Sequence, residues 1–445
     1  MTNGKFTRRD VLKGSGAIAG AAALGATDLF GFAKAWAQSA PWKPEKGAKL
    51  QFTRWKRFVQ SEDDAFRAIV ASFSKATGCP VTVAEEGFDD VQPKASVAAN
   101  TGQGPDMFWA IYSTPQLFPT KTLDVSDVAS YLGKKYGGWV PLAETYGKAG
   151  NKWICLPVTI SGNYINYRQS SIEKAGFKQV PKDMDGFLAL MAGLKKNGTP
   201  GGFALGHASG DGNAWTHWLL WAFGGSLVDK NDKVAINSPG TAQALEYCKK
   251  LYETFAPGTV AWNDSFNNKA FLAGEIHLTN NGISIYAAAQ RDAAKDPKLK
   301  EIAADMNHAF WPIGPVGKPT EFQVCFPVMA MGYTKYPNAC KAFLAYWMEA
   351  DQYNKWLEGS VGYMTHTLNA YDNNPVWTED PKRAVFRDAT KRSLWAGYPG
   401  SIGEKAASAL AEFIVVDMFA NVCTGREDVA GAIKQAERQA RRVYR

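Results

Sequence analysis

The stretch Leu50-Gln51-Phe52-Thr53-Arg54-Trp55 alternates side-chain character in the way that is typical of a β-strand. A helical periodicity follows over residues 63–76 and stops at Gly78, and Pro80-Val81-Thr82-Val83-Ala84 is predicted to be the next strand. The same order of strand, helix and strand recurs along the chain. Further helices are expected over residues 183–196, 213–223, 239–255, 337–356 and 402–423. This repetition predicts an α/β fold with layers of helices on a mostly parallel sheet.

The N-terminus has the organisation of an export signal. Thr7-Arg8-Arg9-Asp10-Val11-Leu12-Lys13 precedes a Gly/Ala-rich apolar run over residues 14–26, and Ala35-Trp36-Ala37 offers a small-x-small cleavage site. The paired arginines resemble those of a twin-arginine signal. The twin-arginine pattern usually has Phe where Val11 stands, so the general secretion route remains an alternative.

A membrane anchor is disfavoured at this place, because Asp28 interrupts the apolar run before the ~20 residues that a span requires. We therefore predict that the signal, residues 1–37, is cleaved after Ala37 and that the mature protein is free in the periplasm. No cysteine precedes Cys79, so a lipid-modified N-terminal cysteine just after the cleavage site is excluded.

Length, charge and cysteine content narrow the class of protein further. The chain has 445 residues, more than one hydrophobic core usually organises, so two lobes are expected. Its formal net charge of +8 falls when the signal is removed, and no alternation of aromatic and basic residues suggests binding to nucleic acid. The six cysteines are widely spaced and form no CxxC motif. We expect buried free thiols rather than disulfides, although the periplasm permits either.

Seven short segments, several of them rich in Gly and Pro, occur in a fixed order along the chain. The most distinctive is Gly102-Gln103-Gly104-Pro105-Asp106-Met107-Phe108-Trp109-Ala110. The full set covers residues 76–83, 102–110, 153–167, 237–239, 271–282, 311–315 and 341–344. In this order they resemble the extracellular solute-binding proteins of the maltose-binding type, which are the periplasmic receptors of carbohydrate ABC importers.

The resemblance implies a two-lobe periplasmic binding protein fold, or Venus flytrap, with a cleft that closes around a ligand by hinge motion. It further implies a carbohydrate ligand, an ABC transporter permease as membrane partner, no cofactor and a monomeric protein. From the matching segments we place lobe one at residues 48–157 and 263–312, lobe two at 158–262 and 328–445, and a hinge crossover at 313–327.

On lobe one, side chains at the carboxyl ends of strands are the expected ligand contacts, because ligands of open α/β sheets bind there. Trp109 follows one strand, and Trp55 and Lys56 end another. A tryptophan offers a sugar ring a rigid apolar platform, whereas the alternative for Trp109 is a place in the core. Tyr112 stands where some family members carry a charged residue, which argues against maltodextrin as the ligand. The basic residues Arg54, Lys56 and Arg57 suggest an acidic sugar or sugar phosphate as an alternative ligand, unless they are solvated rim charges.

On lobe two, the expected contacts are polar residues after the first crossover and in a later loop. The candidates are Ser161, Asn163, Asp211, Trp215, Asn281 and Trp395. An aspartate accepts hydrogen bonds from sugar hydroxyls and a tryptophan stacks on a ring. The alternatives are that Trp215 packs inward and that Trp395 holds its own loop in place.

The sequence contains no set of residues that predicts catalysis. His207, Asp211 and His217 do not match a zinc-binding spacing, and neither a Gly-x-Ser-x-Gly motif nor a GxxxxGK loop is present. We therefore predict no catalytic residue and no metal site. A periplasmic carbohydrate-acting enzyme is kept as the rival class, which turnover of a glycoside would reveal.

Overall fold

The strand, helix and strand predicted from residues 50–84 form one edge of the first lobe. The computed structural model describes residues 34–445. In it, α2 (Gln60–Thr77) connects β1 (Leu50–Trp55) to β2 (Val81–Glu86), and the two strands pair in parallel. Helix α2 ends at Gly78, whose left-handed φ of 71° lets its N–H bond back to Ser74. This conformation favours glycine because it lacks a Cβ atom. The predicted elements are confirmed here.

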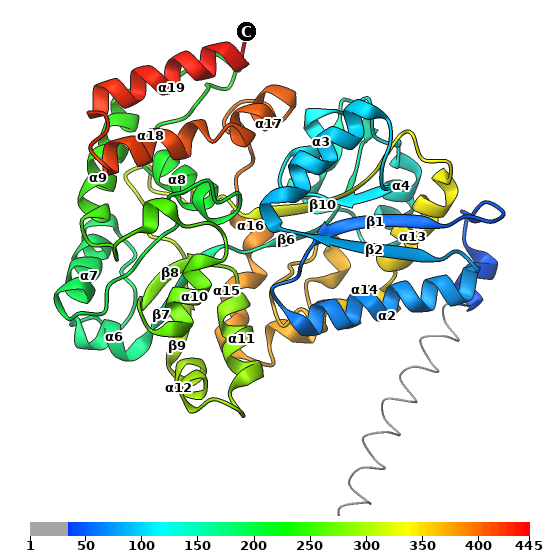
Figure 1. Cartoon of the computed structure of the whole chain (residues 1–445), viewed down its shortest axis with the longest axis horizontal. Helices are drawn as coiled ribbons and strands as arrows, with labels where there is room; N and C mark the ends of the chain where they lie inside the picture. The colour runs from blue at the N-terminus through cyan, green and yellow to red at the C-terminus, as the bar shows by residue number, and fades with distance from the viewer. Residues whose placement is uncertain (1–33) are drawn as a thin grey trace, which may run out of the picture.

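Lobe one is built on a five-stranded sheet of order β2-β1-β3-β10-β6 (Figure 1). The other strands are β3 (Met107–Trp109), β10 (Val324–Ala330) and β6 (Leu156–Ser161). Helices α3 (Val91–Thr101), α4 (Ser126–Lys135), α13 (Pro337–Trp347) and α14 (Ala350–Gly359) belong to this lobe with α2. Strand β10 runs antiparallel to both of its neighbours. The α/β class is therefore confirmed, but only β2, β1 and β3 pair in parallel as predicted.

Lobe two contains a smaller antiparallel sheet of order β8-β7-β9, with helices around it (Figure 1). Its strands are β7 (Tyr164–Arg168), β8 (Leu278–Asn281) and β9 (Met306–Ala309). Its helices are α6 (Gln169–Lys174), α7 (Met184–Lys196), α8 (Asp211–Ala222), α9 (Pro239–Tyr252), α10 (Phe266–Ala273), α11 (Ser284–Asp292), α12 (Pro297–Asp305), α18 (Ile414–Cys423) and α19 (Val429–Val443).

Shorter elements complete the two lobes and the connections between them. They are η1 (Phe88–Asp90), η2 (Thr114–Leu117), α5 (Pro141–Gly147), β4 (Lys148–Ala149), β5 (Lys152–Trp153), η3 (Thr259–Ala261), η4 (Asn369–Tyr371), η5 (Pro375–Trp377), η6 (Pro381–Arg383), α15 (Ala384–Arg387), α16 (Ala389–Arg392) and α17 (Glu404–Ala411). The helix predicted over 402–423 is thus two helices, α17 and α18, which are separated at Phe413 by its left-handed φ of 54°.

Strand pairing divides the chain between the lobes differently from the predicted boundaries. Residues 263–312 were expected in lobe one, but β8 and β9 within them pair with β7 of lobe two. Residues 328–445 were expected in lobe two, but β10 completes the sheet of lobe one, and α13 and α14 pack on α2. The connection from β9 to β10 crosses between the sheets over residues 310–323, which overlaps the predicted hinge at 313–327.

Most of the predicted export signal lies outside the described residues. Its last residues are described, because residues 34–39 are helical and Trp36 is buried against Phe73 and Tyr346. The indole N–H of Trp36 donates to Glu349. Cleavage after Ala37, which remains a prediction, would remove this tryptophan from the mature protein.

Candidate ligand-binding cleft

Three adjoining pockets lie between the two lobes, and all three share Phe88 in η1. Phe88 follows the carboxyl end of β2, where ligands of open sheets bind. The loops that end β1 and β2 supply one wall, and residues 209–213 and 263–265 of lobe two supply the opposite wall. The cleft is therefore at the sheet edge that the sequence indicated.

The wall from lobe one is largely aromatic. Phe58, Phe88, Phe326 and Tyr363 line the central pocket. Trp55 lies directly beneath them, with its ring centroid 4.5 Å from that of Phe326 and 5.5 Å from that of Phe88. This wall offers flat apolar rings held rigidly from below.

The wall from lobe two is polar and carries two buried carboxyl groups. The Asp211 carboxylate accepts hydrogen bonds from the side-chain amides of Asn163 and Asn267, at 2.5 and 2.7 Å. The Asp264 carboxylate accepts from the backbone N–H groups of Gly210 and Asp211, at 3.0 and 2.6 Å. These partners hold both carboxyl groups in fixed orientations at the start of α8.

Burial shifts the protonation of both acids. Loss of hydration raises the pKa of Asp211 to about 7, and the charge of Asp89 adds to this rise. Burial, followed by the charges of Asp211 and Asp89, raises the pKa of Asp264 well above its ordinary value. Burial therefore favours the protonated form of both groups, and a positive ligand group could displace these protons.

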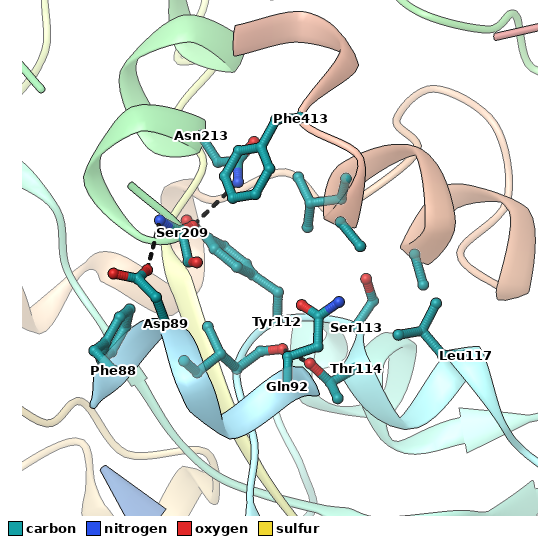
Figure 2. A pocket seen from close by; sticks show the side chains of 14 residues that line it. Phe88, Asp89, Gln92, Tyr112, Ser113, Thr114, Leu117, Ser209, Asn213 and Phe413 are labelled. Carbon is teal, nitrogen blue, oxygen red and sulfur yellow. Dashed lines mark hydrogen bonds between the residues drawn. The ribbon is translucent and has the colours of Figure 1, made fainter. Parts of the chain in front are cut away.

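Two hydrogen bonds join the lobes across the cleft. The Tyr112 hydroxyl donates to the Gly210 carbonyl at 3.1 Å. The Ser209 N–H donates to Asp89 Oδ1 at 3.3 Å, as Figure 2 shows. The two inner pockets have cavity volumes of about 20 and 30 Å³, whereas the pocket at the mouth reaches about 550 Å³. A water molecule fits the inner pockets but a sugar ring does not. The structure is thus closed, and ligand entry requires the lobes to separate.

Six of the ten side chains predicted to contact a ligand lie in this cleft. They are Lys56 at the mouth, Tyr112 in the pocket of Figure 2, and Ser161, Asn163, Asp211 and Asn281 in the central pocket. They come from both lobes, as a clamshell site requires. The polar members of the predicted set are therefore brought together.

The four tryptophans of the predicted set line none of these three pockets. Trp55 and Trp109 are fully buried in lobe one, where the indole N–H of Trp109 donates to the Phe326 carbonyl at 3.2 Å. Trp215 is buried in lobe two and donates to the Ala204 carbonyl at 2.6 Å. Trp395 donates to Gly400 in its own loop and packs on Tyr398. In each case the ring packs against neighbouring residues of its own lobe or loop and does not face the cleft.

The aromatic residues that line the central pocket and two of the cleft acids, Asp89 and Asp264, were not predicted from the sequence. Phe58 and Phe88 follow the carboxyl ends of β1 and β2 by a few residues, so the rule that selected Trp55 would also have selected them. Tyr363 and Asp264 lie in loops with no comparable sequence pattern.

In the basic cluster predicted as an anion site, the two arginines are paired with neighbouring carboxylates, whereas Lys56 is exposed at the mouth of the cleft. Arg54 is fully buried and paired with Asp63 and with Glu85, the latter at 3.0 Å, and burial lowers its pKa to about 10. The Arg57 guanidinium pairs with Glu62 and lies 4.3 Å from the ring centroid of Trp55. Within residues 34–445, no group of three or more His, Cys, Asp or Glu side chains is arranged to hold a metal ion.

Comparison with known proteins agrees with this architecture. A probable ABC transporter-binding protein of Deinococcus radiodurans is 25% identical over 307 residues, which cover 66% of this chain and 70% of the relative. The GacH receptor of Streptomyces glaucescens, solved unliganded and with acarbose, superposes with a TM-score of 0.73 at 20% identity, covering 89% of this chain and 98% of its own. A sugar transporter protein of Arthrobacter chlorophenolicus with bound laminaribiose gives a TM-score of 0.76 at 17% identity, covering 89% and 99%.

Two family patterns match the sequence itself. Residues 5–25 match the twin-arginine translocation signal, so the protein is exported to the periplasm by the route that the arginine pair indicated. Residues 68–385 match the bacterial extracellular solute-binding proteins. This second match spans both lobes and the cleft between them, and the chain belongs to the bacterial extracellular solute-binding protein family.

Proposed function

We propose that this protein captures a carbohydrate between its lobes and, as a monomer, delivers it to the permease of an ABC transporter. The observation that carries the proposal is the pairing of an aromatic wall on lobe one with a hydrogen-bonding wall on lobe two. Sugars present apolar C–H faces and hydroxyl groups, so they match both walls at once. The solved relatives with acarbose and laminaribiose support a carbohydrate as the ligand class.

The proposed contacts divide by lobe. Phe88 and Tyr363 would stack on or flank the sugar rings. Asp211, Asn163 and Asn281 would bond the hydroxyls from the opposite side. Because the inner pockets are too small for a ring in the closed form, ligand would enter the open form and favour re-closure around itself.

An acidic sugar is less well supported as the ligand than a neutral one. Arg54 and Arg57 are paired with carboxylates, although Nη1 and Nη2 of Arg57 have no partner among the described residues. The rival enzymatic class has no observation in its favour.

A fluorescence titration tests the proposal. Closure on a ligand changes the surroundings of the cleft aromatics and of Trp55 beneath them, so a panel of neutral mono- and oligosaccharides and polyols is expected to contain members that change intrinsic fluorescence saturably. The same sugars, recovered and analysed by mass spectrometry after long incubation, are expected to be chemically unchanged. The absence of a saturable response to any sugar would refute a carbohydrate as the ligand. Release of hydrolysis products would show that the protein is an enzyme.

A further inference from the structure

Acidic side chains outnumber basic ones in the lining of the cleft. Asp89, Asp211 and Asp264 approach one another around the start of α8, and Asp90 and Glu86 stand at the mouth. Of the positive groups, Arg57 is paired with Glu62, and Lys94 bonds Glu86 with its Nζ at 2.5 Å. Lys56 is exposed at the mouth. The two inner pockets are therefore lined by Asp89, Asp211 and Asp264 and, among the described residues, by no basic side chain.

A second, independent observation concerns hydrogen bonding. Asn213 is 2% exposed and lines the pocket of Figure 2 together with Asp89. Its Nδ2 donates to the Ser209 carbonyl at 3.1 Å, but its Oδ1 has no partner among the described residues. A buried acceptor without a donor costs stability. The pocket therefore lacks a hydrogen-bond donor, which a ligand could supply.

Aromatic rings line the adjoining central pocket, which shares Phe88 with the pocket of Figure 2. Phe58, Phe88 and Tyr363 line the central pocket beside Asp211 and Asp264. The face of an aromatic ring attracts a cation, and the attraction grows when water is excluded. Carboxylates, an unpartnered acceptor and ring faces all favour a positively charged donor and disfavour an anion.

We propose that the inner cleft recognises the protonated amine of an amino sugar, with Asp264 and Asp89 as its carboxylate partners, and rejects sugar carboxylates and phosphates. This inference rests on the proposed carbohydrate function and narrows the ligand class within it.

Proton release provides a signature of this recognition. The titratable groups around Asp264 are Asp89, Asp211, Tyr112 and Tyr363 in the inner pockets, and Lys56, Arg57, Glu86 and Asp90 at the mouth. The buried Arg57 guanidinium is paired with Glu62, and its Nη1 and Nη2 have no hydrogen-bond partner among the described residues. Burial keeps the pKa of Asp264 high, so an arriving ammonium group must displace a proton to form the ion pair. Affinity for an amine therefore rises as pH increases towards the raised pKa of Asp264, until the ligand amine itself loses its proton. Affinity for a neutral sugar lacks this dependence.

The test uses sugars that differ in one substituent: glucose, 6-amino-6-deoxyglucose, glucosamine, glucuronate and glucose 6-phosphate. Calorimetry at pH 6 and 7.5, in buffers of different ionisation enthalpy, measures affinity and protons released together. We expect at least one amine to bind about tenfold more tightly than glucose at pH 7.5, the scale of one charge-assisted hydrogen bond, with net proton release. The two anions should bind at least about tenfold more weakly than glucose.

Variants connect the effect to the proposed group. Asp264→Asn is expected to bring the ratio of amine to glucose affinity close to one and to abolish proton release, whereas Asp185→Asn, on the exposed start of α7, should change neither. An anion that binds as tightly as the amine, or an amine with no advantage over a bound neutral sugar, overturns the amine site but leaves the carbohydrate function standing. If no sugar in this panel or in the neutral oligosaccharide panel binds, both proposals fail.

A separate observation concerns two thiols in lobe two. Cys248 in α9 and Cys423 at the end of α18 have their Sγ atoms 3.2 Å apart. Cys248 is buried, but Cys423 is partly exposed and can be reached by an oxidant. Twin-arginine export moves the protein into a compartment where disulfides persist.

We infer that Cys248 and Cys423 become a disulfide after export. The two thiols lose two protons and two electrons to a disulfide-containing oxidant, which leaves as two thiols. The new bond would join α9 to α18 and so brace the helix that follows Phe413, a residue of the cleft wall.

Thiol counting tests the pairing. Reduced protein has six alkylatable cysteines when unfolded, and after treatment with oxidised glutathione we expect four, with one peptide linking residues 248 and 423. Cys423→Ser should prevent the loss of thiols, whereas Cys340→Ser should still lose two. Six remaining thiols, or a linkage between other cysteines, would contradict the inference.

Discussion

Trp109→Ala is expected to destabilise lobe one by about 3–5 kcal/mol without weakening ligand binding by the folded protein. The Trp109 ring packs against Trp347 and Trp55, with centroids 4.8 and 5.1 Å apart, and Phe66 and Trp356 complete its surroundings. Removing it leaves a large cavity and deprives the Phe326 carbonyl of its donor. Urea unfolding followed by circular dichroism measures the loss of unfolding free energy.

Ligand titration on the same sample separates a core role from a binding role. Trp215→Ala is the corresponding variant in lobe two, because its ring is also fully buried and its N–H is bonded to the backbone. Both variants should retain the affinity of the unmodified protein within about twofold once the folded fraction is taken into account. An affinity loss of tenfold or more with unchanged stability would show that these tryptophans contact the ligand.

Phe88→Ala is expected to weaken carbohydrate binding about ten- to hundredfold, the effect of removing an aromatic anchor worth about 1–3 kcal/mol. Phe88 lines all three pockets and is only partly buried in the closed protein. Its removal should therefore cost far less unfolding free energy than that of Trp109. Calorimetric titration with the best sugar of the panel gives the change in affinity.

Phe266→Ala is the matched control for this variant. Phe266 is 43% exposed at the start of α10 and lines none of the three pockets. Its removal should leave the affinity unchanged. Equal affinities of the Phe88 and Phe266 variants would show that the aromatic wall does not bind the sugar.

Of the fold, the sequence by itself determined the elements that depend on neighbours in the chain. The alternation over Leu50–Trp55, the helical period that ends at Gly78 and the helix starting at Pro239 all depend on side chains within a few residues of one another. The arginine pair and the Gly/Pro-containing segments are also short motifs of neighbouring residues. They were therefore enough to indicate export and the solute-binding protein family. Rules of this kind need no knowledge of the distant chain.

Only the tertiary structure decided which strands pair and which side chains face the cleft. Trp55, Phe58 and Phe88 all follow strand ends, but Trp55 is covered by Phe326, which belongs to a strand more than 250 residues further along the chain. Arg54 and Arg57 look like an anion site until Glu85 and Glu62 fold against them. The three carboxyl groups of the cleft come from segments that are far apart in the sequence. Such contacts result from the packing of distant segments, and sequence periodicity contains no information about that packing. The class of protein was therefore evident from the sequence, whereas the chemistry of its cleft was not.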